Sequence, residues 1–192
     1  MGNKMENKER FFEMINELRI DNAVKQKKGL HFILTSVIIW TMITLVQTST
    51  LPIMTKNMLT FFCSVPLMPL AFLVSKWIKV DFQNKSNPLT SLGIIFSVNQ
   101  MLYILIAMWV YSSVPDKMLM VYAMIFGAHL MPYGWLYQSR TYFVLSVIIP
   151  IGALMLGLYS QPVVLAAAMV CVEIIFCVCL FWENRGLKSA NA

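Results

Sequence analysis

Long stretches without charge determine what this chain can fold into. No acidic or basic residue lies between Lys28 and Lys56 or between Lys85 and Asp116, and Glu173 alone interrupts the last such stretch. Only 12% of the residues are charged, against about 25% in a typical soluble domain. An apolar segment of about 20 residues crosses the hydrocarbon core of a bilayer as a helix. The sequence therefore predicts an integral membrane protein in contact with the lipid bilayer.

The predicted fold class is all-α: a polytopic transmembrane helix bundle of six spans. The expected spans are residues 30–46, 58–74, 92–110, 118–137, 142–159 and 163–182. Aromatic residues near the ends of these spans are expected to form interfacial belts. They are Trp77, Tyr111, Tyr137, Tyr142, Tyr159 and Trp182. The chain then divides into a cytoplasmic amphipathic helix (1–28), a six-helix transmembrane domain (29–183) and a short cytoplasmic tail (184–192).

Lysine and arginine are distributed unequally between the two sides of the expected bundle. Of 15 such residues, only Lys56 and Lys117 fall in loops on one side, and the rest fall in the leader, two loops and the tail of the other. Cytoplasmic loops carry an excess of these residues, so both termini are predicted to be cytoplasmic. The net charge of +6 then reflects topology and contact with anionic lipid headgroups, and nucleic acid is not an expected partner.

The hydrophilic leader, residues 1–28, carries apolar residues at helical spacing. Phe11, Met14, Ile15 and Leu18 fall on one side of such a helix. This pattern predicts an amphipathic helix on the inner membrane surface, with docking of a partner protein as the alternative. The polar leader is too long for a signal peptide.

Four polar side chains are expected near the middle of the membrane: Asn99, Gln100, His129 and Glu173. A charged residue at the centre of a membrane helix costs about 2.5–3.5 kcal/mol, so Glu173 must face the bundle or a wet cavity. Two interpretations remain open. Glu173 and His129 could bind or relay a proton, with the two amides contacting a solute. Alternatively, a neutral Glu173 could hydrogen-bond Asn99 or Gln100 and hold three helices together.

Two Leu-Met-Pro motifs, ending at Pro69 and Pro132, fall late in the second and fourth spans. Proline removes a backbone donor within a helix, and paired kinks open cavities or permit rocking in transporters. Tyr122 and Tyr133 share a face of the fourth span with its histidine. Together with Tyr103 on the third span, these residues are predicted to support the polar site.

Other residues are expected to be structural. Ser146, Pro150, Ala153 and Gly157 on the fifth span permit close approach of neighbouring helices. His31, near the start of the first span, is expected to be solvated at the interface. The four cysteines fall within predicted spans without metal-site spacing, so neither a disulfide framework nor a metal site is expected.

Four segments also carry a resemblance to known proteins. They are KKGLHFILTSVIIW, LPIMTKNMLTFF, PLMPLAFLVSKWIKVDFQNKSNPL and VYAMIFGAHLMPYGWLYQS. At these segments the chain resembles a family of small bacterial integral membrane proteins of unknown function. The resemblance implies a location in the inner (plasma) membrane of a bacterium and no particular activity.

The leading functional hypothesis is a small transporter or permease-like protein, proton-linked through Glu173 and His129, that carries an unknown small solute. A homodimer is an expected assembly, because six spans make a small transporter. The alternative is a non-transporting membrane sensor or interaction subunit that docks a partner through residues 1–28. A third is an intramembrane enzyme with the same two residues as acid and base. No catalytic, nucleotide or dinucleotide motif is present, so catalysis is less favoured and no cofactor is expected.

Overall fold

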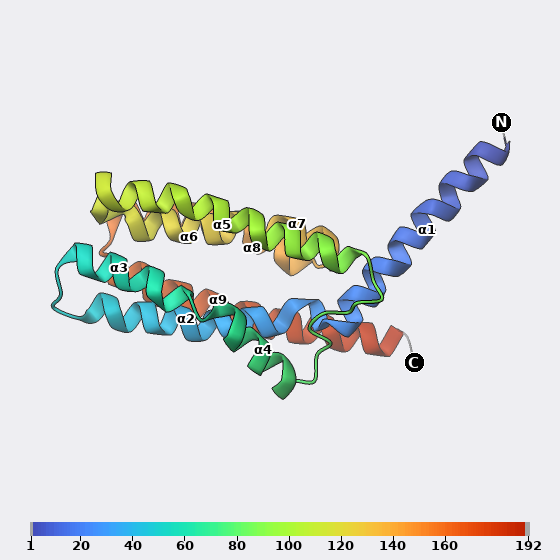
Figure 1. Ribbon diagram of the computed structural model, residues 1–192, viewed down its shortest axis with the longest axis horizontal. Helices are drawn as coiled ribbons and strands as arrows, with labels where there is room; N and C mark the ends of the chain where they lie inside the picture. Colours follow the sequence, from blue (N-terminus) through green and yellow to red (C-terminus); the bar gives the residue numbers. More distant parts are fainter. Residues whose placement is uncertain (1, 191–192) are drawn as a thin grey trace.

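The computed structural model describes residues 2–190 of the chain, and the side-chain surroundings of residues 5–187. Over that range every regular element is a helix (Figure 1). The elements are α1 (Gly2–Lys25), η1 (Lys27–Gly29), α2 (Leu30–Thr48), α3 (Ile53–Ser64), α4 (Leu67–Trp77), α5 (Leu89–Ser113), η2 (Pro115–Lys117), α6 (Met118–Ala128), α7 (Met131–Leu136), α8 (Arg140–Tyr159) and α9 (Pro162–Ala190).

Several helices begin at residues that suit the unpaired amide groups of a first helical turn. Pro115 opens η2 and Pro162 opens α9, positions at which a missing amide hydrogen costs nothing because first-turn amides have no helical partner. At the start of α8, the Ser139 hydroxyl accepts a hydrogen bond from the Tyr142 amide at 3.4 Å. The Asn87 side chain does the same for the Leu89 amide of α5 at 2.9 Å.

The described helices make the chain a multi-pass membrane protein. Five helical segments are long and apolar enough to cross a membrane: 27–48, 89–113, 115–136, 140–159 and 162–187. Helices α3 and α4 meet at a bend of 42° and make a sixth span if they cross as one unit. The prediction of an all-α bundle with several spans is confirmed. The expected tail is a continuation of α9 as far as Ala190, and residues 1, 191 and 192 lie outside the described residues.

The bundle has two layers (Figure 1). Helices α2, α3, α4 and α9 form one layer, and α5, α6, α7 and α8 form the other. The first layer is centred on α2 and α9, whose buried side chains include Trp40, Ile43 and Phe176. In the second layer, α6 and α8 pack along each other. The space between the two layers is where the polar residues of the spans meet.

Glycines bring α6 and α8 close together. A Cβ atom added to Gly127 would lie 2.6 Å from side-chain atoms of Ile149 and Pro150, and one added to Gly157 would lie 2.3 Å from Met120. Neither position has room for a side chain. The predicted packing role of the small residues on the fifth span is confirmed, because Ser146 and Ala153 are buried as well.

The last turns of α9 and the whole of α1 lie at one end of the bundle, and α1 points away from it (Figure 1). The last turns of α1 are docked: Asn84 donates to Asp21 at 3.1 Å and to Asn22 at 3.2 Å, and Asn87 donates to Asp21 at 2.9 Å. Burial alone would raise the pKa of Asp21. Hydrogen bonds from Lys25, Asn87 and Asn84 outweigh burial and hold that pKa below its ordinary value. The carboxylate is thus part of the joint between α1 and the loop before α5.

Three side chains expected at the membrane interface are buried, and those predictions were wrong. His31 is fully buried against Phe32 and Phe82, with ring centroids at 4.3 and 5.3 Å. Tyr137 and Tyr142 are buried too, and their hydroxyls donate to the Gln26 side chain and the Lys28 carbonyl. Hydropathy places a residue along the membrane normal and says nothing about which way it faces. The belt residues that are exposed are Trp77, Tyr159 and Trp182.

Candidate functional site

Two broken helices border one cavity. The first break separates α3 from α4 at residues 65–66, and the second separates α6 from α7 at residues 129–130. Each break falls immediately before or within a Leu-Met-Pro motif. Pro69 and Pro132 have no amide hydrogen to give to the carbonyl four residues earlier, so the regular ladder cannot run through either motif. The sequence signal for this feature is the repeated motif.

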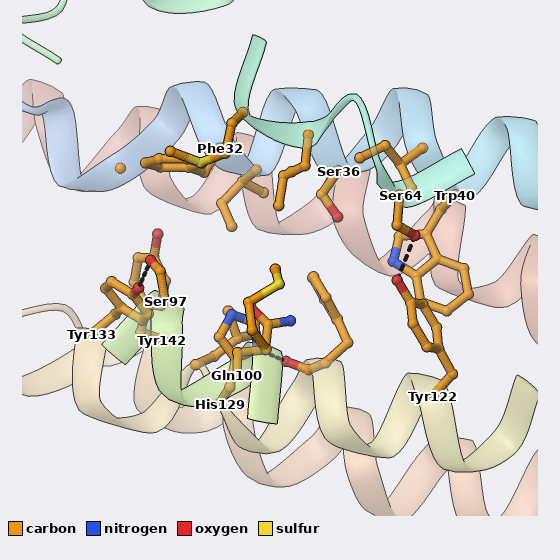
Figure 2. A pocket seen from close by; sticks show the side chains of 18 of the residues that line it. Phe32, Ser36, Trp40, Ser64, Ser97, Gln100, Tyr122, His129, Tyr133 and Tyr142 are labelled. Atoms are coloured by element: carbon orange, nitrogen blue, oxygen red, sulfur yellow. Dashed lines mark hydrogen bonds between the residues drawn. The ribbon is translucent and has the colours of Figure 1, made fainter. Parts of the chain in front are cut away.

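The cavity lies between the two layers and has a volume of about 110 Å³. Figure 2 shows Phe32 and Ser36 on the α2 side, and Gln100 and His129 on the opposite side. The polar lining residues are Ser36, Ser64, Ser97, Gln100, Tyr122, His129, Tyr133, Tyr137 and Tyr142. The lining also includes the aromatic side chains of Phe32, Trp40 and Phe126. No lysine, arginine, aspartate or glutamate is among the described residues that line it.

Two tyrosine–serine pairs fix the polar groups of the cavity wall. The Tyr122 hydroxyl lies 2.5 Å from the Ser64 hydroxyl, next to the first break (Figure 2). The Tyr133 hydroxyl lies 2.7 Å from that of Ser97 and donates to the Gly93 carbonyl at 3.0 Å. Each pair joins different helices, so the hydroxyls are held in place by the bundle and not by one flexible side chain.

His129 sits at the break between α6 and α7. Its Nδ1 is hydrogen-bonded to the Phe126 carbonyl, which requires Nδ1 to carry the proton. In a neutral imidazole this leaves Nε2 as an acceptor, and Nε2 makes no hydrogen bond in the described part of the chain. The ring is held edge-on by Phe126 and Tyr133, with centroids at 5.4 and 6.0 Å. His129 therefore offers the cavity an acceptor of fixed position.

Glu173, on α9, is fully buried, with 0% of its surface exposed. Its burial was predicted from the cost of placing a charge in lipid, and this is confirmed. Neither carboxyl oxygen has a hydrogen-bond partner of good geometry, so the alternative interpretation, a hydrogen bond to Asn99 or Gln100, is not found in the structure. Ser36 is a polar neighbour of the carboxyl group. Because Ser36 also lines the cavity, the carboxyl group lies directly behind the cavity wall.

The structure separates the remaining predicted site residues. Gln100 lines the cavity, whereas its neighbour Asn99 is exposed on α5. Tyr103 is also exposed, at 42%. No hydrogen bond or ring contact joins Glu173 to His129 within the described residues. Of the predicted site residues, the cavity thus gathers the Gln100 amide, the histidine and the two tyrosines of the fourth span.

Sequence reasoning missed the contribution of α2. Phe32, Ser36 and Trp40 line the cavity from one side, and their spacing of four residues places them on one face of a helix. That spacing was the available signal. It was weak because serine and tryptophan are ordinary residues in membrane helices.

Contacts between segments join the bundle at the end that holds the termini. Lys28 forms an ion pair with Glu183 at 2.8 Å, and Thr141 donates to the same carboxylate from its amide and hydroxyl at 3.0 and 2.6 Å. Between these residues and the cavity lies Gly29, with φ at +70°, where a Cβ would approach the Tyr142 hydroxyl to 3.0 Å. Three helices are therefore joined at this end of the cavity.

Metal-binding and catalytic constellations are not found among the described residues. No three His, Cys, Asp or Glu side chains come together there to hold a metal ion. The four cysteines are free. In the same part of the chain, no hydrogen bond joins a serine hydroxyl to His129, so no nucleophile and base are paired.

Fold and site together define a helical multi-pass membrane protein with a cavity between two layers, whose wall is mostly apolar and carries several uncharged polar side chains. The chain belongs to a family of unknown function (DUF7010), whose model matches residues 15–183. The match includes both broken helices, the cavity residues and Glu173. No curated protein and no solved structure matches the chain.

Proposed function

We propose that this protein is a small permease that carries an uncharged polar solute across the membrane, with Glu173 as the proton-linked group. The observation that carries the proposal is the cavity between the two layers, whose mostly apolar wall carries uncharged hydrogen-bonding groups and is backed by an unpartnered carboxyl group. Binding near the midplane, at broken helices, is the arrangement that transporters use. It lets a solute be approached from either side by rearrangement around one site.

The cavity lining defines the class of solute. A volume of about 110 Å³ is somewhat below the roughly 150 Å³ of an engineered cavity that holds benzene, so the solute is a small molecule. Serine and tyrosine hydroxyls, the Gln100 amide and the His129 acceptor provide hydrogen bonds of both kinds. The aromatic side chains of the lining favour a solute that also has an apolar face. Because no charged residue lines the cavity, a strongly charged solute would remain unneutralised.

The position of Glu173 supports a coupling between protons and solute. An ionised carboxylate without a partner in a water-excluded interior costs several kcal/mol, so ionisation requires hydration or a new hydrogen bond. Ser36 is the group available to provide it on the cavity side. A change of cavity occupancy that moves Ser36 then alters the balance between the two forms of Glu173. Coupling between protons and solute requires a contact of this kind, one that differs between the empty and the occupied cavity.

The orientation of the protein is part of the proposal. The last turns of α9 and the whole of α1 lie at one end of the bundle (Figure 1), and the segments expected on this side carry most of the lysine and arginine residues. By the positive-inside rule it is the cytoplasmic end of an inner (plasma) membrane protein. Residues 1–28 are then a cytoplasmic helix, residues 29–183 the six-span domain, and residues 184–192 the tail. Reporter fusions at each terminus test this arrangement.

Proton movement into liposomes that contain a trapped pH dye tests the function. Wild type is expected to move protons, and Glu173→Gln to abolish that flux while the protein remains folded. Tyr133→Phe is expected to reduce it, because this hydroxyl bridges Ser97 and the Gly93 carbonyl at the cavity. Tyr103→Phe is the matched control, since Tyr103 lies on the outer surface. Flux that survives Glu173→Gln would refute the proton-linked role.

A second candidate function is docking of a protein partner through α1. Phe11 and Phe12 are exposed at 54% and 58% on the part of α1 that points away from the bundle, and Asp21 holds the other end of the helix in place. Deleting residues 1–14 separates this function from transport. Loss of activity in that variant, with Glu173→Gln tolerated, would identify the protein as an interaction subunit.

A further inference from the structure

Helix α5 is the peripheral span of the bundle. Only 11% of its most apolar segment is buried, against 33–44% for the other four spans of sufficient length. Its inner side faces the cavity through Ser97 and Gln100 and is closed by the buried residue Ala107. The outer side is almost entirely apolar, as expected for a surface in contact with lipid. Away from the exposed serines at its two ends, one amide side chain departs from that pattern.

That residue is Asn99. It is exposed, and its side chain makes no hydrogen bond in the described part of the chain. Asn99 lies about 15 Å along the helix axis from Leu89, at 1.5 Å per residue, which is half the roughly 30 Å thickness of the hydrocarbon core. An asparagine side chain is too short to reach the headgroups from there. An amide that cannot reach water needs a partner inside the membrane.

The residues around Asn99 repeat with the spacing of a coiled-coil seam. Intervals of three and four residues alternate along this line, which is the a/d pattern that brings two helices together with a left-handed crossing. The seam consists of Leu92, Ile95, Asn99, Leu102, Ile106 and Trp109. All but the first are exposed, so none of the residues whose side-chain surroundings are described covers the seam.

We propose that α5 is the interface of a homodimer, in which Asn99 of one copy hydrogen-bonds Asn99 of a second copy in the middle of the membrane. Two copies inserted with the same orientation are related by a two-fold axis along the membrane normal, and their α5 helices run in the same direction. Identical residues then face each other at the same depth. An amide is both donor and acceptor, so a pair of asparagines satisfies itself.

The choice of a second copy as the occupant rests on this self-complementarity. A single asparagine at an a position fixes the register and number of helices in a parallel pair. A lipid acyl chain would leave the amide unpaired. In the pair, the cavity of each copy stays on the inner side of its own α5, away from the interface. Each copy therefore keeps a complete site, and dimerisation does not require the proposed transport activity.

Cysteine cross-linking in liposomes tests the seam. In the purified full chain, with the four native cysteines replaced by alanine, Ile106→Cys and Met108→Cys make a matched pair. The two residues are exposed at 50% and 54% and lie about 3 Å apart in depth, but only Ile106 is on the seam. Oxidation is expected to cross-link Ile106→Cys into a dimer and to leave Met108→Cys monomeric. No cross-link at either position, or equal cross-linking at both, would overturn the proposal.

Fluorescence energy transfer between labelled copies, measured over a range of protein-to-lipid ratios, tests the asparagine pair. Asn99→Leu is expected to raise the dimer dissociation constant about 3- to 30-fold, the range spanned by polar contacts between membrane helices. Gln100→Leu is the control, because the neighbouring residue faces the cavity, and it is expected to leave the constant unchanged. An unchanged constant for Asn99→Leu would overturn the pairing of these amides.

Discussion

The close approach of α6 and α8 makes Gly127→Ala the most informative single substitution. The new Cβ would lie 2.6 Å from Ile149 Cγ2 and Pro150 Cδ, whereas carbon atoms in contact prefer about 3.5–4.0 Å. The two helices must therefore separate by about 1 Å, the shortfall from that contact distance. Because Gly127 precedes the break that carries His129, the same displacement reaches the cavity wall.

The expected cost follows from two opposing terms. Overpacking a tight contact costs about 1–3 kcal/mol, and replacing glycine by alanine in a helix contributes about 1 kcal/mol of stabilisation. Gly152→Ala isolates the second term, because a Cβ at Gly152 meets nothing within 4 Å. The difference between the two variants is then the steric cost alone, about 1–3 kcal/mol.

Thermal unfolding of the two variants in the same detergent measures this difference. At about 2–4 °C per kcal/mol for a chain of this size, Gly127→Ala is expected to unfold about 2–12 °C below Gly152→Ala. Gly152→Ala itself is expected to unfold at or slightly above the wild-type temperature. Equal unfolding temperatures for the two variants would show that α6 and α8 are not in the close contact described, and the steric reasoning would be refuted.

Three further outcomes are expected at the end that holds the termini. Gly29→Ala places a side chain at φ +70° and 3.0 Å from the Tyr142 hydroxyl, so the unfolding free energy should fall by about 1–2 kcal/mol. Lys28→Met leaves Glu183 without its cation and should cost about 1–3 kcal/mol, with most of it recovered in the double variant with Glu183→Gln. Docking lowers the pKa of Asp21, so the contribution of this carboxylate to the docking of α1 is complete above pH about 4 and is lost as the pH falls through the lowered pKa. Hydrogen exchange in α1 should therefore rise at that low pH in wild type but not in Asp21→Asn.

The spans were predictable because the bilayer imposes their length and apolarity. The predicted ends of the fifth span, 142 and 159, agree closely with α8, which covers Arg140–Tyr159. The second span was less well predicted, since it is divided into α3 and α4 by a bend. Proline marked the region of the bend, but its angle depends on how α4 packs against α2, and packing is not encoded in local sequence.

The candidate site was predicted in part, and the errors have a common cause. Asn99 and Gln100 are adjacent, so they point about 100° apart on a helix of 3.6 residues per turn. In a membrane helix both sides are apolar, and no contrast between a wet and a dry face shows which of the two points inward. The same ambiguity hid the role of Ser36. Glu173 was the exception, because only an interior position avoids the cost of its charge.

The two proline breaks give the cavity a permanence that packing alone does not provide. A kink caused by packing can straighten when neighbouring helices move, because each amide hydrogen can find its helical acceptor again. Pro69 and Pro132 contain no such hydrogen, so no rotation of the backbone can restore the missing hydrogen bond at either position. The two interruptions beside the cavity are thus a consequence of the covalent structure of proline. Whatever motions the bundle undergoes, they take place around two fixed discontinuities that border the same space.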